Sequence, residues 1–148
     1  MIIDVSGEAL NAALQEGMFL IKPNIREFRE LAGKEIKEES QIMAAAQKMV
    51  EDGRCEVLVI SLGAAGALVV SEKYTEHILP PTVPIVSKVG AGDSMVAGIV
   101  LSLARRNSLR ESVIFGVATG TAAIMTPGTE LCRREDVQRL YAGMISGA

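Results

Sequence analysis

The segment that most limits the fold is an uninterrupted apolar run, Val57 to Ile60, near the middle of the chain. It consists of Val, Leu, Val and Ile, and a run of this kind without alternating polar positions is typical of a strand covered on both faces. A helical pattern precedes it over Glu38 to Asp52, where apolar residues recur every three or four positions, and Gly53 follows as a stop. A covered strand next to an amphipathic helix predicts a layered α/β fold.

Strands and helices alternate along the rest of the chain as well. Asn24 is expected to open a helix that Gly33 ends, and Arg133 to Asp136 to begin the last helix. We find no internal repeat, low-complexity segment or linker, which predicts a single domain over residues 1–148. The other expected elements are strands at 2–5, 18–21, 67–71, 74–79 and 83–86, a turn at 63–66, and helices at 8–15, about 93–105 and 109–125.

A glycine-rich segment, Ser87 to Ser94, leads directly into apolar positions at helical spacing. Gly90, Ala91 and Gly92 therefore lie where a helix begins, and its first N–H groups have no intrahelical partner and carry partial positive charge. Small residues there let an anion approach closely. A carboxylate such as Asp93 at this place suggests a general base, whereas the alternative interpretation is an Asp that caps the helix. The expected buried face of this helix consists of Val96, Ile99, Val100, Leu103 and Ala104.

Five motifs follow one another along the chain: Lys22 to Glu27, Ser61 to Ala67, Val89 to Gly98, Gly116 to Ala123 and Thr126 to Cys132. Together, and in this order, they resemble the motifs of the ribokinase/PfkB carbohydrate kinases. Within that family they most resemble the minor, PfkB-type 6-phosphofructokinases. The resemblance implies a ribokinase-like layered α/β/α fold, and the matched motifs belong to the C-terminal half of such a kinase. We therefore expect this chain to correspond to that half, with most sugar contacts and the lid in the other half.

The resemblance implies roles for individual residues in phosphoryl transfer. Asp93 would be the catalytic base, and the N–H groups of Gly90, Ala91 and Gly92 would form the anion hole. Lys22 would lie by the nucleotide phosphates. The remaining implied ATP and Mg²⁺ contacts are Asn24 and Glu27 by metal-bound water and phosphate, Ser61, Gly63 and Gly66 by phosphate and ribose, and Ile85, Val117 and Thr121 near the adenine and ribose.

Each of these assignments has a structural alternative. Asn24 with Glu27 three residues later fits a helix capping box, and Lys22 fits a solvated lysine at a strand end. The glycine pair after Ser61 fits a tight turn between strands. For Ile85, Val117 and Thr121 the alternative is plain core packing.

The family resemblance also implies a monovalent cation, K⁺, beside the anion hole. Two positions depart from the pattern, because an amide side chain is expected at Thr126 and a basic residue at Glu130. Pro127 and Gly128 otherwise fit an ordinary turn. The matching positions are Ser87, Val89, Ala123, Thr126, Gly128 and Glu130.

Composition excludes several other classes of function. The net charge of −3 over 148 residues gives no general affinity for nucleic acid or anionic membranes. No apolar run approaches the roughly 20 residues of a membrane helix, and we expect a cytoplasmic protein. Cys55 and Cys132 stand in no paired spacing and are expected to be free thiols. The only histidine, His77, is expected on a strand surface, which counts against a histidine metal site or a Ser-His-Asp triad.

The resemblance therefore implies transfer of the γ-phosphoryl group of MgATP to the 1-hydroxyl of fructose 6-phosphate. Fructose-1-phosphate and tagatose-6-phosphate kinases remain open, and so does a fragment that binds ATP without turnover. A dinucleotide-dependent oxidoreductase is disfavoured because no Gly-x-Gly-x-x-Gly follows the first strand. Apolar surface left uncovered by the absent half predicts a homo-oligomer, most simply a dimer.

Overall fold

The computed structural model describes residues 2–3, 12, 14–15, 17–33, 36–128 and 130–147. The chain divides into two compact units, Met1–His77 and Ile78–Ala148. The helix expected over 8–15 falls largely outside the described residues, as does the second half of the strand expected over 2–5. Each unit is described by itself.

The first unit is built on a sheet whose strands follow the chain order β1-β2-β3-β4-β5. The strands β1 (Ile2–Ile3), β2 (Met18–Ile21) and β3 (Cys55–Ser61) are parallel, with Leu20 opposite Val57. The strand β4 (Ala67–Ser71) is antiparallel to β3, and β5 (Tyr74–Ile78) ends the sheet. The predicted alternation of strands and helices is thus confirmed as a mixed α/β sheet.

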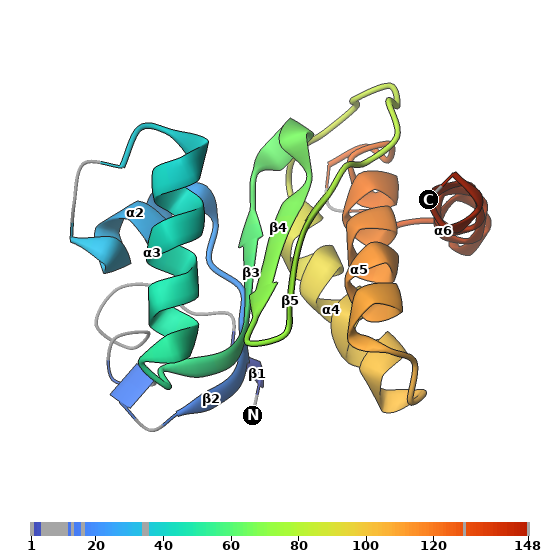
Figure 1. The fold of residues 1–148 in the computed structure, drawn as a ribbon. Coiled ribbons are helices and arrows are strands. Elements are labelled where there is room, and N and C mark those ends of the chain that lie inside the picture. Colours follow the sequence, from blue (N-terminus) through green and yellow to red (C-terminus); the bar gives the residue numbers. More distant parts are fainter. Residues whose placement is uncertain are drawn as a thin grey trace. The chain divides into compact units, whose positions relative to one another are not determined.

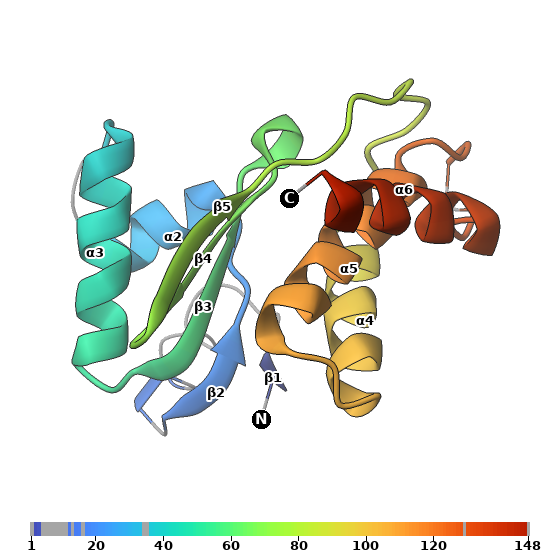
Figure 2. The ribbon, with the colours of Figure 1, turned by 45° about the vertical axis from the view of Figure 1, so that its right-hand side comes forward.

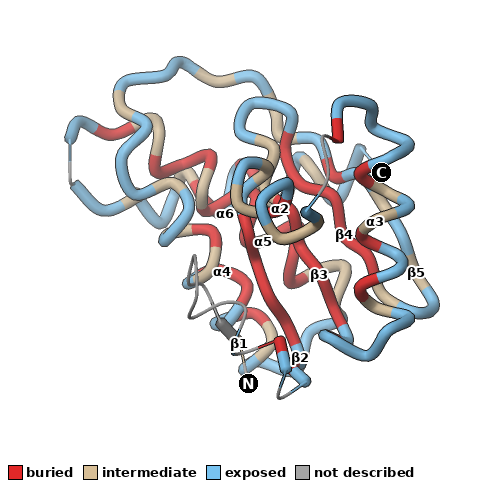
Figure 3. The backbone as a smooth tube through the Cα atoms, turned by 90° about the vertical axis from the view of Figure 1, so that its left-hand side faces the viewer, coloured by how far each residue is buried: buried red, intermediate tan, exposed pale blue. Residues whose placement is uncertain are grey.

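The helices α2 (Ile25–Ala32) and α3 (Glu39–Glu51) cover one face of this sheet (Figure 1). Phe28 of α2 and Ala46 of α3 are fully buried in one core cluster with Leu58 and Ile60 of β3. Val59, which alternates with these two strand residues, is also fully buried. Both faces of β3 are therefore buried, as its apolar run predicts, and most of β3 and β4 is coloured as buried in Figure 3.

The second unit contains the helices α4 (Ala91–Ala104), α5 (Leu109–Ala123) and α6 (Arg134–Ser146) (Figure 2). The helices α4 and α5 lie side by side and antiparallel, with glycines at the contact. A Cβ atom on Gly98 would lie 2.6 Å from Thr119 Oγ1, and one on Gly116 would lie 2.4 Å from Ile99 Cγ1. This close approach of two backbones requires residues without side chains. The core between α5 and α6 contains Ala118, Ala122, Val137 and Leu140.

The prediction of the buried face of α4 is partly wrong. Ile99 is buried, but Val100 is 41% exposed and Ala104 is exposed. The face of α4 that carries Gly98 packs on α5, because a glycine there permits the closest backbone approach. The buried residues of α4 are Met95, Gly98, Ile99 and Ser102.

The prediction of a strand at 83–86 is also wrong, because this segment is irregular. Pro84 has no N–H group to give to a neighbouring strand. The N–H group of Val86 instead donates to the Ile124 carbonyl at 2.8 Å, just beyond the last turn of α5. Val83 packs against the core cluster of α5 and α6. The segment is therefore held as a loop on the helices of its own unit.

Candidate functional site

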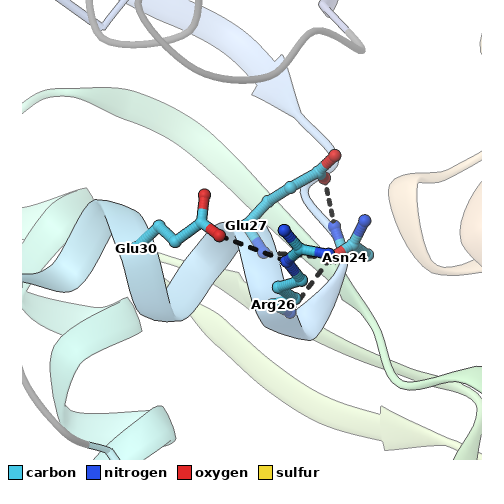
Figure 4. Close-up of polar contacts among 4 residues, drawn as sticks. All are labelled: Asn24, Arg26, Glu27 and Glu30. Atoms are coloured by element: carbon cyan, nitrogen blue, oxygen red, sulfur yellow. Dashed lines mark hydrogen bonds and ion pairs between the residues drawn. The ribbon is translucent and has the colours of Figure 1, made fainter.

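Helix α2 begins with a complete capping box. The Asn24 side-chain oxygen accepts from the N–H groups of Arg26 at 3.0 Å and Glu27 at 2.9 Å. Glu27 Oε2 in turn accepts from the N–H group of Asn24 at 2.8 Å (Figure 4). Gly33 ends the helix in the left-handed conformation. The capping interpretation of Asn24 and Glu27 is thus confirmed, and the NH₂ group of Asn24 is left out of these cap contacts.

Asn24 and Ser61 are brought side by side at the carboxyl ends of β2 and β3. The two residues form a parallel bridge, and the N–H group of Ser61 donates to the Pro23 carbonyl at 3.0 Å. Lys22, between β2 and this bridge, is only 4% exposed. The interpretation of Lys22 as a solvated surface lysine is therefore wrong. The carboxyl ends of parallel strands are where α/β sheets gather their ligands.

The segment after Ser61 is a tight turn built around a short 3₁₀ helix, Gly63–Ala65. Gly63 and Gly66 have φ angles of 61° and 85°, which residues with a side chain rarely adopt. The turn is closed by the N–H group of Leu62 on the Gly66 carbonyl at 2.7 Å and that of Gly66 on the Gly63 carbonyl at 3.0 Å. Gly63, Ala64 and Ala65 are exposed, so a ligand can reach the backbone of the turn.

In the second unit, helix α4 begins without a side-chain cap. Its N-cap is Gly90, with a φ angle of 79°, and the first backbone bond of the helix joins the Ser94 N–H group to the Gly90 carbonyl at 2.9 Å. The N–H groups of Ala91, Gly92 and Asp93 precede that bond and have no partner within the helix. Asp93 is the third helical residue and is exposed, so the interpretation of Asp93 as the N-cap is wrong.

The positions implied for a cation lie in two loops that the structure joins. The N–H groups of Val86 and Ser87 both donate to the Ile124 carbonyl, and Ser87 Oγ lies 3.5 Å from the Gly128 carbonyl oxygen. Thr126 is buried, and its hydroxyl lies 2.9 Å from the Ala123 carbonyl oxygen and 3.2 Å from that of Glu130. Ser87 Oγ also accepts from the N–H group of Val89 at 3.2 Å. Hydroxyl and carbonyl oxygens at a helix C-terminus are the donors that a hard cation prefers.

The three residues implied near the adenine differ in exposure. Val117 and Thr121 are one turn apart on α5 and buried, and the Thr121 hydroxyl donates to the Val117 carbonyl at 2.7 Å. The hydroxyl of Thr121 is thus satisfied within its own helix. Ile85 is 55% exposed and lies in the loop before α4. Only Ile85 of the three presents a large apolar surface to solvent.

Other chemistries find little support in the described part of the chain. It holds no group of three or more His, Cys, Asp or Glu side chains suited to a metal ion. Both cysteines are free, as predicted, and burial raises the pKa of the Cys55 thiol to about 11. Among the described helices none is long and apolar enough to cross a bilayer. His77 lies on β5, as expected.

One supporting residue, Gly120 of α5, was not anticipated. A Cβ atom there would lie 2.9 Å from the carbonyl oxygen of Ala91, in the first turn of α4. Gly120 therefore sets how closely that turn approaches α5. The sequence signal was the recurrence of glycine at 116 and 120, which places both on one face of a helix.

The fold defined by these elements is of the ribokinase-like class. The crystal structure of phosphofructokinase-2 from Escherichia coli in complex with potassium superimposes with a TM-score of 0.94 and 45% identity, over 97% of this chain and 47% of that one. Residues 1–136 match the family described as pfkB family carbohydrate kinase, and the chain belongs to that family.

Two curated relatives from Escherichia coli (strain K12) indicate the branch of the family. ATP-dependent 6-phosphofructokinase isozyme 2 is 46% identical over 142 residues, which are 95% of this chain and 46% of that protein. The 1-phosphofructokinase is 37% identical over 142 residues, which are 96% of this chain and 45% of that protein. The chain thus spans about half the length of the curated relatives it matches.

Proposed function

We propose that this chain carries the nucleotide-binding and catalytic portion of an ATP-dependent 6-phosphofructokinase. The reaction would transfer the γ-phosphoryl group of MgATP to the 1-hydroxyl of fructose 6-phosphate. The observation that carries this proposal is the start of α4, where Gly90 leaves the first N–H groups uncapped beside the exposed carboxylate of Asp93. The identity of 46% to 6-phosphofructokinase isozyme 2 supports the choice of substrate.

In this mechanism Asp93 accepts the proton of the attacking sugar hydroxyl. The N–H groups of Gly90, Ala91 and Gly92 face the negative charge that builds up on the transferred group, and the positive end of α4 adds to their effect. Because these donors belong to a rigid helix start, they need no reorganisation during the reaction. Gly120 stabilises this helix start, because the lack of a side chain at Gly120 lets Ala91 pack directly on α5.

The nucleotide is proposed to contact three sets of residues. Lys22 and the exposed turn of Gly63 and Gly66 would bind its phosphates, and Ser61 would add a hydroxyl at the end of β3. Asn24 and Glu27 would hold water on the Mg²⁺ ion while they also cap α2, because the hydrogen bonds of the capping box involve neither the Asn24 NH₂ group nor Glu27 Oε1. Ile85, Val117 and Thr121 would lie near the adenine and ribose. Mg²⁺, when bound with ATP, supplies charge neutralisation for the transferred phosphoryl group.

A bound K⁺ ion fits the loops beside α4. The chemistry of the donor set is all oxygen, from the carbonyls of Ala123, Gly128 and Glu130 and the hydroxyl of Ser87. The Thr126 hydroxyl has a single hydrogen and lies near two carbonyl oxygens, so it satisfies one of them at a time. The carbonyl of Val89 would complete the set. Mostly carbonyl ligands are compatible with Thr and Glu at positions 126 and 130.

Calorimetry followed by a coupled assay tests the proposal. The purified chain is titrated with MgATP, and ADP formation is then measured with fructose 6-phosphate. Saturable binding with sugar-dependent turnover supports the kinase. Binding without turnover would favour the non-catalytic ATP-binding fragment, and a folded chain that binds no MgATP would refute the nucleotide site in this chain.

A second candidate activity is 1-phosphofructokinase, because the chain is also 37% identical to such an enzyme. The same assay with fructose 1-phosphate and with tagatose 6-phosphate in place of fructose 6-phosphate distinguishes the three substrates. The reaction on fructose 6-phosphate would place the protein in glycolysis and in the cytoplasm.

We also propose that the protein self-associates, most simply as a dimer. Leu79, Val89 and Leu131 are 64%, 61% and 87% exposed, which is a large apolar exposure for three side chains. Light scattering over a range of concentrations tests this, and a monomer at every concentration would contradict it.

A further inference from the structure

The only histidine of the chain contacts the glycine turn of the first unit. His77 Nε2 lies 2.6 Å from the carbonyl oxygen of Ala65, the last residue of the 3₁₀ helix. Since a carbonyl oxygen accepts only, the ring nitrogen must carry the hydrogen and donate it. Ala65 is twelve residues from His77 along the chain, so this bond ties the turn between β3 and β4 to the last strand of the sheet.

The other ring nitrogen faces a second element. His77 Nδ1 lies 3.4 Å from Glu39 Oε1, in the first turn of α3. This contact is attractive only when the ring carries a hydrogen on both nitrogens, because a neutral ring that donates from Nε2 leaves Nδ1 as an acceptor facing the carboxylate. The His77 side chain is 31% exposed and that of Glu39 is 67% exposed, so solvent weakens the contact and the bond to Ala65 is the one that holds the ring.

The bond reaches the part of the turn that its own backbone bonds leave unsupported. The N–H groups of Leu62, Ala65 and Gly66 are all bonded within the turn, at 2.7, 3.2 and 3.0 Å. These bonds fix the ends of the turn on each other. The carbonyl of Ala65 takes part in none of these three bonds and accepts from the His77 ring. Its direction is coupled through one peptide plane to the orientation of the Gly66 N–H group.

We propose that His77 is a positioning residue that holds the Gly63–Gly66 turn in its nucleotide-binding shape through the Ala65 carbonyl. The inference rests on the proposed function, since the turn would contact phosphate and ribose only in a nucleotide-binding protein. His77 touches no nucleotide itself in this proposal. Its contribution is to the affinity for MgATP rather than to the rate of phosphoryl transfer.

The test compares four variants of the full chain. His77→Ala removes the donor, and His77→Gln keeps an N–H donor on a side chain of similar length. Glu39→Gln removes the carboxylate beside Nδ1 and leaves the donor to Ala65 in place. Asp52→Asn is the matched control, because it removes another exposed ion pair of α3, with Lys48 at 3.6 Å, that does not touch the turn. Thermal unfolding of each variant confirms that the fold is intact.

The first measurement needs no nucleotide. Amide hydrogen exchange of Ala65 and Gly66 should be faster in His77→Ala than in the unmodified chain, and unchanged in Asp52→Asn. The second is the Kd for MgATP by calorimetry. We expect His77→Ala to raise it roughly three- to tenfold, the loss of one hydrogen bond, and His77→Gln to restore it to within about twofold. Glu39→Gln should leave the Kd within about twofold of the unmodified chain, because the bond from His77 to Ala65 is kept.

A third measurement uses the ring itself as the probe. Because the chain has one histidine, its ring proton signals in an NMR spectrum need no assignment, and they should shift on addition of MgATP with the calorimetric Kd. An unchanged Kd in His77→Ala, or equal weakening in His77→Gln, would overturn the positioning role. If the unmodified chain binds no MgATP, the proposed function fails and the functional part of this inference with it, while hydrogen exchange alone decides whether His77 holds the turn.

Discussion

The starts of helices α2 and α4 solve the same physical problem in opposite ways. Each helix has N–H groups in its first turn that find no partner within the helix. At α2 the side chains of Asn24 and Glu27 close on these groups in a reciprocal capping box. At α4 the corresponding residue is Gly90, which has no side chain and adopts a left-handed φ angle.

Helix α5 resembles α2, because Ser108 and Glu111 form another capping box. Helix α6, like α4, begins without a side-chain cap, at Arg133, so the lack of a cap does not by itself identify a ligand site. What distinguishes α4 is its small N-cap, Gly90, which leaves the first N–H groups accessible to the proposed phosphoryl group. Because no side chain caps α4, this helix must be held mainly by its packing on α5.

The largest effect is expected from Asp93→Asn. Removing the base should lower kcat by about 10²- to 10⁴-fold and leave the Kd for MgATP within about twofold, because the amide keeps the size of the side chain. Asp136→Asn is the matched control, since Asp136 is likewise the third residue of its helix, α6, and bonds Arg139 of the same helix. Turnover of Asp93→Asn within tenfold of the unmodified chain would remove Asp93 as the base.

Next in size is the loss of stability expected from Gly116→Ala. The new Cβ atom would lie 2.8 Å from the Met95 carbonyl oxygen as well as 2.4 Å from Ile99 Cγ1, so the backbone of α4 or α5 must move. Overpacking of this kind costs about 1–3 kcal/mol of unfolding free energy. Gly143→Ala is the control, because nothing lies within 4 Å of its Cβ position and alanine favours a helix. Urea unfolding that shows equal stability of the two variants would contradict packing as the support of α4.

Asn24→Ala tests the capped helix, α2, and should lower the free energy of unfolding by less than Gly116→Ala does. Loss of an N-cap costs about 1 kcal/mol, and Asn24→Ser should recover most of it because serine also caps well. If Asn24 has the additional role proposed at the metal-bound water, the serine variant regains stability but still binds MgATP more weakly. Urea unfolding and calorimetry on the same samples separate the two roles. Equal recovery of both properties would leave capping as the whole role of Asn24.

The sequence-based predictions are accurate where the deciding contacts are local in the sequence, and they fail where those contacts join distant residues. Helix α2 was placed correctly from Asn24 to Gly33 because its cap and stop are local. The buried face of α4 was misplaced because it depends on Gly116, a glycine in another helix. The segment 83–86 has β-branched residues, but the N–H group of Val86 donates to the Ile124 carbonyl at the end of α5.

The candidate site shows the same division. The turn glycines, the capping box and the glycine start of α4 were predictable from neighbours in the sequence. The bond between His77 and Ala65 and the approach of Gly120 to Ala91 join residues that are distant along the chain. No local pattern contains such pairings. The chemical roles of Asp93, Lys22 and the cation loops came from the family resemblance rather than from residue spacing.

The smallest expected effect concerns the capping box of α5 and its dependence on pH. The hydrogen bonds from the Ser108 hydroxyl and N–H group hold the pKa of Glu111 below its usual value of 4.5. A carboxylate whose pKa is lower in the folded state stabilises the protein above the unfolded pKa, and this stabilisation is lost as the pH falls through the folded pKa. Glu111→Gln should therefore be less stable than the unmodified chain at pH 7 and nearly equal to it at strongly acid pH. Urea unfolding of both proteins at the two pH values measures the difference. Because α4 has no such box, a Gly90 variant should show no matching dependence, and a pH-independent difference for Glu111→Gln would show that its carboxylate contributes no charge-dependent capping.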